Sequence, residues 1–70
     1  MDLNTEQAES ILERIHELRQ EHRDLDDAID RLGEGPFIDE VQLRRMKRKK
    51  LLLKDKIVEL EALLLPDQPA

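Results

Sequence analysis

Cysteine, tryptophan and tyrosine are absent from this 70-residue sequence, which has one phenylalanine and two glycines. Without cysteine there are no disulfides, no thiolate chemistry and no cysteine-bound zinc. The longest apolar run is only four residues, 62–65, too short to span a bilayer. The first residues, Met1-Asp2-Leu3-Asn4, contain no basic stretch and no apolar export segment, so we expect a cytoplasmic protein.

Charge is abundant. Charged residues make up 41% of the chain and the net charge is -5, while Leu, Ile, Val and Phe together supply 30%. This apolar fraction is enough for an ordered seam and lies above the disordered range. The length allows one small domain at most, over 1–70. The composition predicts long solvated helices of the all-α class, with no enzyme activity and no cofactor.

Glycine and proline divide the chain into two segments. Gly33-Glu34-Gly35-Pro36 lies near the midpoint, and Pro66-Asp67-Gln68-Pro69-Ala70 closes the sequence. Because neither intervening segment contains an internal Gly or Pro, each is free to form one continuous helix. We predict helices over about 5–32 and about 39–65, a turn over about 33–38, frayed residues at 1–3, and a disordered tail at 66–70.

Both segments carry a heptad repeat, in which apolar positions alternate at spacings of three and four. A mean period of 3.5 keeps one narrow stripe against a partner helix. In the first segment the seam positions are Ala8, Ile11, Ile15, Leu18, His22, Leu25, Ile29 and Leu32. In the second they are Leu43, Met46, Lys50, Leu53, Ile57, Leu60 and Leu64.

Capping residues mark the expected helix ends. Asn4 with Gln7, and Asp39 with Gln42, have the spacing of capping boxes at helix starts. Gly33 follows the last turn of the first segment, where a left-handed glycine commonly ends a helix.

The short connection makes the two helices antiparallel neighbours. Seam residues whose numbers sum to about 75 then face one another, so that Leu32 meets Leu43 and Ile11 meets Leu64. The sequence predicts an antiparallel two-helix coiled-coil hairpin. Phe37 lies beside the turn, and we expect it to cap the end of the seam.

A hairpin of this size buries little surface and commonly needs oligomerisation. Further aliphatic residues lie outside the seam, three of them at seven-residue spacing. We predict that two hairpins form a homodimeric four-helix bundle through these residues; the alternative is that they are scattered exposed aliphatics. They are Leu12, Leu51, Leu52, Val58, Leu63 and Leu65.

Two motifs carry a family resemblance. The first segment has H-x-x-L-D-x-x-I, formed by His22, Leu25, Asp26 and Ile29. The second has K-x-x-[KR]-L-x-L-K-D-x-I, formed by Lys47, Lys50, Leu51, Leu53, Lys54, Asp55 and Ile57. Over roughly 15–62 the sequence resembles the YdcH-like family of small bacterial proteins of unknown function. The resemblance implies a cytoplasmic helical hairpin that self-associates, and it implies no activity.

Polar residues interrupt the seam at mid-helix. His22 occupies a seam position with Asp26 one turn later, while Lys50 lies one layer along on the facing helix. We predict a polar cluster of these three residues, extending to Lys54, that fixes the alignment of the helices. The alternative is a histidine packed on Leu53 with one ring nitrogen in water. No nucleophile or second acid–base group converges there, so catalysis is not expected.

One short motif raises the question of a metal. Glu13 and His16 form a single E-x-x-H, whereas di-iron bundles need two such motifs and further inward carboxylates. His16 and His22 are six residues apart and do not share a helix face. We therefore predict no metal site.

Basic residues concentrate at 44–56, whereas residues 1–33 have a net charge of -6. Opposite charges on the two helices favour correct pairing. We expect ion pairs beside the seam: Asp26 with Lys47, and Glu21 with Lys56 or Lys49.

Three arginines on the outer face, Arg44, Arg45 and Arg48, have no obvious acidic partner. They are candidates for docking an acidic protein or, alternatively, for binding nucleic-acid phosphates. The net acidity and the lack of stacking aromatics argue against nucleic acid. A membrane-surface role for the second helix would need an apolar face without a partner, and the first helix supplies one. We expect a protein-interaction module that binds itself and a further protein partner, with the Gly33–Phe37 loop as another candidate surface.

Overall fold

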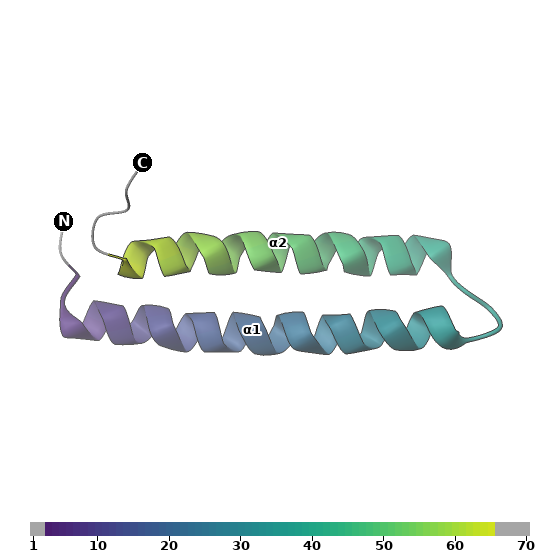
Figure 1. Ribbon diagram of the computed structural model, residues 1–70, viewed down its shortest axis with the longest axis horizontal. Coiled ribbons are helices and arrows are strands. Elements are labelled where there is room, and N and C mark those ends of the chain that lie inside the picture. Colours follow the sequence, from purple (N-terminus) through teal and green to yellow (C-terminus); the bar gives the residue numbers. More distant parts are fainter. Residues whose placement is uncertain (1–2, 66–70) are drawn as a thin grey trace.

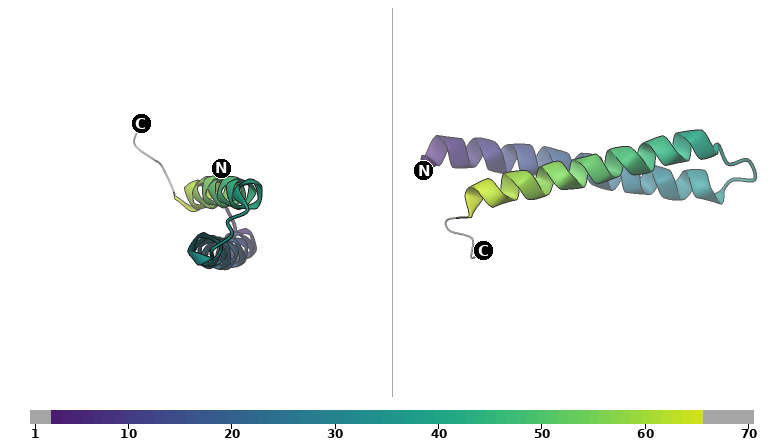
Figure 2. Two further views of the ribbon diagram at one scale, coloured as in Figure 1. Left: turned by 90° about the vertical axis from the view of Figure 1, so that its right-hand side faces the viewer. Right: turned by 90° about the horizontal axis from the view of Figure 1, so that it is seen from above.

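The computed structural model describes residues 3–65, and these form two antiparallel helices joined by one short loop (Figure 1). Helix α1 runs over Thr5–Glu34 and helix α2 over Glu40–Leu64. Seen end-on, the helices lie side by side, and seen from above they cross at a shallow angle (Figure 2). The predicted all-α hairpin is therefore confirmed. The predicted tail at 66–70 and the first two residues lie outside the described residues.

The predicted seam is the contact between the helices. Every seam position is buried or half-buried, and outside the seam only Ala28 and Glu61 share that state among the described residues. Ile15, Leu18 and Ile57 are 2–3% exposed and form the core. The residues packed around them are Ile11, Leu53, Leu60 and Leu64. The core thus includes both members of the layers Ile11–Leu64, Ile15–Leu60 and Leu18–Ile57.

Both helices begin at capped residues. The side chain of Asn4 accepts the Gln7 amide hydrogen at 2.8 Å, and the Gln7 side chain accepts that of Asn4 at 3.1 Å, which completes a capping box. Asp39 accepts the Gln42 amide hydrogen at 3.0 Å, but within residues 3–65 no bond returns from the Gln42 side chain. Helix α2 therefore begins with half of the predicted motif.

The end of α1 corrects one prediction. The helix continues through Gly33 to Glu34, and its C-cap is Gly35 with φ −77° and ψ 159°, an extended conformation. Neither glycine has a positive φ. The prediction of a left-handed Gly33 was wrong because an extended residue two positions later starts the connection, and the helical hydrogen bonding continues up to it.

Phe37 also departs from the prediction. Its side chain is 92% exposed and does not cap the seam. The seam ends at the layer of Leu32 and Leu43, and the extended Gly35 leads the chain away from that layer. The Phe37 side chain therefore has no seam residues on which to pack.

Candidate functional site

The polar layer lies in the middle of the seam. The Lys50 ammonium (Nζ) donates a hydrogen bond to Asp26 Oδ1 at 2.6 Å, in an ion pair between the two helices. The Lys50 side chain is 31% exposed and that of Asp26 is 52% exposed. The ammonium therefore extends from the seam to its edge, where the pair is partly exposed to solvent.

Electrostatics at this layer favour an ionised carboxylate. The hydrogen bond from Lys50 and its positive charge hold the pKa of Asp26 below its ordinary value, and the neighbouring His22 acts in the same direction. His22 is half-buried at its seam position. Lys54 is exposed and forms no ion pair with any residue of the described chain. The structure thus joins Asp26 to Lys50, with His22 close enough to act on the carboxylate, and leaves Lys54 at the surface.

The expected flanking ion pairs differ from those observed. Asp26 pairs with Lys50 and not with Lys47, because the Lys50 stem reaches the edge of the seam directly opposite. Glu21 and Lys49 line one groove but form no ion pair. Lys56 instead lies 3.7 Å from Glu59 on its own helix.

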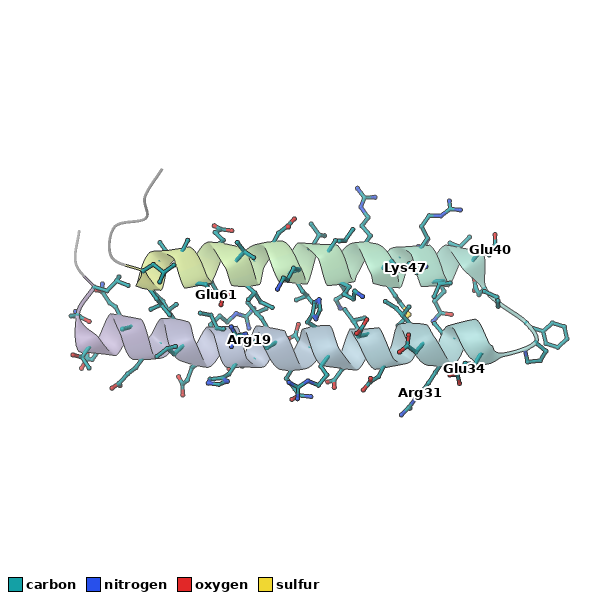
Figure 3. All side chains as sticks on the ribbon, viewed as in Figure 1. Arg19, Arg31, Glu34, Glu40, Lys47 and Glu61 are labelled. Carbon is teal, nitrogen blue, oxygen red and sulfur yellow. The ribbon has the colours of Figure 1, made fainter. Side chains whose placement is uncertain are left out.

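One interhelical pair was not anticipated from the sequence. Arg19 donates to Glu61 at 2.7 Å, and the two side chains extend towards each other across the helices (Figure 3). Each follows a seam residue by one position, Leu18 in α1 and Leu60 in α2. In an antiparallel pair such positions face each other, so the heptad pattern does contain the signal that predicts this pair.

The six predicted self-association residues are all exposed. Their exposed fractions lie between 47% and 64%. Helix geometry distributes them over more than one side of the hairpin. They are Leu12, Leu51, Leu52, Val58, Leu63 and Leu65.

The basic outer residues Arg44, Arg45 and Arg48 are exposed, and none forms an ion pair with a residue in 3–65. Their guanidinium groups are accessible to a partner. Glu13 and His16, the possible metal ligands, are both exposed. The described part of the chain has no group of three or more His, Asp or Glu side chains placed to hold a metal ion.

Comparison with known sequences places the chain in a family. The sequence pattern of a protein family of unknown function, DUF465, matches residues 15–61. The match covers the loop and most of both helices, which is more than half of the chain, so the chain belongs to that family. No curated protein and no solved structure matches it. Neither helix, over the residues described, has the length and apolarity needed to cross a membrane.

Proposed function

We propose that the protein is a non-enzymatic interaction module, a helical hairpin that self-associates as a homodimer. The observation that carries this proposal is the imbalance between its surface and its core. Among the described residues ten large hydrophobic side chains are exposed and four are buried. A scaffold this small gains limited stability from its own core, and association with a second copy adds burial. The resemblance to the YdcH-like family and the cytoplasmic location remain predictions from the sequence.

The polar layer supports a role in alignment. His22 and Lys50 occupy positions that aliphatic residues would fill with greater stability. A cation that must reach Asp26 disfavours shifted pairings of the helices, because a shift would leave it inside the seam without a partner. We therefore propose that this layer fixes the register of the hairpin and the number of copies in the assembly.

Sedimentation equilibrium over the micromolar range tests self-association. We expect the wild-type chain to sediment as a dimer. The triple variant Leu51→Ser, Val58→Ser, Leu65→Ser is expected to sediment as a helical monomer, because it removes exposed side chains and leaves the core intact. A matched control substitutes exposed residues near the loop: Phe37→Ser, Ile38→Ser and Val41→Ser. A folded wild-type monomer throughout that range would contradict the proposal.

The alignment role has its own test in His22→Leu. We expect this variant to be more stable to heat and to form mixed assemblies. If the variant were more stable and still formed only the dimer, His22 would merely lower the packing stability of the seam and would have no role in alignment.

A second candidate function rests on the exposed arginines. Arg44, Arg45 and Arg48 have no ion-pair partner within the described chain, so they are accessible to phosphate groups or to an acidic protein. A mobility-shift assay at low salt, with single- and double-stranded substrates, tests the nucleic-acid alternative. Binding that disappears when all three arginines become Glu would favour it, whereas no binding by the wild-type chain would end it.

A further inference from the structure

The Arg19–Glu61 ion pair identifies one side of the hairpin. Both residues follow a seam residue by one position, and one step along a helix turns the side chain by about 100°. Because Arg19 and Glu61 meet across the two helices, residues that follow the seam by one position lie on the same side of the hairpin in both helices. Four exposed aliphatic residues share this position, and we call them the Val58 face: Leu12, Leu51, Val58 and Leu65.

The other two exposed leucines lie elsewhere. Leu63 precedes the seam residue Leu64, which places it on the opposite side of the hairpin, and Leu52 lies two positions after Lys50 on the outer surface. The six predicted contact residues therefore do not form one surface. The largest aligned group is the stripe at seven-residue spacing formed by Leu51 and Val58 of α2 and by Leu65, its C-cap residue.

We infer that a second copy of this chain covers the Val58 face, with the two α2 helices antiparallel about a two-fold axis beside Val58. This inference rests on the proposed self-association. Leu51, Val58 and Leu65 are evenly spaced, so reversing the stripe reproduces it. A two-fold interface requires such a self-complementary surface. Val58 then lies beside Val58 of the second copy, and Leu51 faces Leu65 of the second copy on both sides of the axis.

The charges beside the stripe fit the same arrangement. Lys54 and Glu61 lie three residues after Leu51 and Val58, which turns them about 60° back towards the seam, so both lie on the edge of the Val58 face nearer to α1. Antiparallel packing about Val58 brings Lys54 of each copy level with Glu61 of the other. Lys54 has no ion-pair partner in the described chain, so dimerisation would supply one.

Orientation follows from the basic half of α2. In a parallel pair, Arg44, Lys47 and Lys54 would each face their own symmetry mates, and like charges across an interface are unfavourable. In the antiparallel pair about Val58, Arg44 and Lys47 extend beyond the facing stripes at opposite ends. The facing stripes span about 21 Å from Leu51 to Leu65, a short overlap that places this interface at the low end of specific interface sizes.

Single-cysteine variants test this arrangement, since the chain has no cysteine of its own. Val58→Cys is expected to form a disulfide-linked dimer under mild oxidation. Leu52→Cys is a matched control with a similarly exposed residue on another face and is expected to stay largely unlinked. Leu51→Cys alone is expected not to link, whereas a mixture of Leu51→Cys and Leu65→Cys chains is expected to link between copies.

The outcomes separate this inference from the proposed function. A monomer in sedimentation would contradict both. A dimer in which Leu52→Cys or Leu63→Cys links in place of Val58→Cys would overturn the face and leave self-association standing. Linkage of Leu51→Cys to itself would overturn the antiparallel orientation, and a dimer in which Val58→Cys does not link would overturn the register.

Charge variants provide a second readout. Lys54→Glu is expected to weaken dimerisation about tenfold, because the two-fold axis repeats the lost contact twice. Lys56→Glu is the matched control, since Lys56 precedes a seam residue and lies on the other side. Equal weakening by both variants would mean that only net charge matters, and it would overturn the Lys54–Glu61 contact.

Discussion

The two halves of the hairpin carry the same heptad repeat but are built differently. Towards the chain termini, Ile15, Leu18 and Ile57 are 2–3% exposed and four further aliphatics pack around them. Towards the loop, Ile29 at 9% is the most buried seam residue. The layers between the halves contain His22 and Lys50. The spacing of the seam therefore determines which residues face inward, whereas the size and polarity of each side chain determine where the stability lies.

Truncation in the two halves gives the largest expected difference. Ile57→Ala is expected to cost about 2–5 kcal/mol, comparable to the roughly 3–5 kcal/mol that a core this small supplies. We expect it to be largely unfolded. Ile29→Ala is the matched control near the loop and is expected to lose about 2 kcal/mol. Urea unfolding followed by circular dichroism measures both, and equal losses would mean that the halves are equally stable.

An apolar substitution in the polar layer tests how the boundary between the halves contributes to stability. Lys50→Leu is expected to raise the stability of the hairpin by about 1 kcal/mol, because a half-buried ammonium is replaced by an apolar side chain. The same change is expected to allow assemblies with more than one number of copies, since the ion pair with Asp26 is lost. Lys47→Leu, at an exposed position on the same helix, is the control. Lower stability for Lys50→Leu would show that the ion pair outweighs the burial of its cation.

The sequence predicted the repeating features of the fold. Each of the fifteen seam positions is buried or half-buried, because burial in a helix pair depends on spacing alone. The sequence places both Lys47 and Lys50 near Asp26, and the spacing does not decide which of them forms the ion pair, since either long side chain reaches that edge. The position of Phe37 was also missed, because it depends on the path of the loop beyond the last layer.

Gly33 and Gly35 show why helix ends are difficult to predict. Both glycines are suited to ending a helix, and the local sequence does not distinguish them. The structure places Gly33 inside α1, and a Cβ there would meet no atom within 4 Å.

This placement gives a prediction of definite sign. Gly33→Ala is expected to stabilise the hairpin by about 0.5–1 kcal/mol, because alanine is the better helix former and nothing obstructs it. A left-handed Gly33 would give the opposite sign. Gly35→Ala is the control, at an extended residue where the new Cβ would make an ordinary contact at 3.9 Å, and we expect a smaller change. Thermal unfolding of both variants measures the difference.

The smallest expected effect concerns the ion pair at the boundary between the halves. Lys50 lowers the pKa of Asp26 from its ordinary value of 3.8, so the ionised carboxylate stabilises the folded chain above that pH, and this contribution disappears as the pH falls through the lowered pKa. Asp26→Asn should therefore melt slightly below wild type at neutral pH and together with it in strong acid. Because Asp26 is half-exposed, high salt should reduce the difference.

Asp27→Asn, exposed on the same helix, controls for the loss of one negative charge. If both variants followed the same pH course, the ion pair would add nothing to the stability of the folded chain, and the polar layer would act on the alignment of the helices alone.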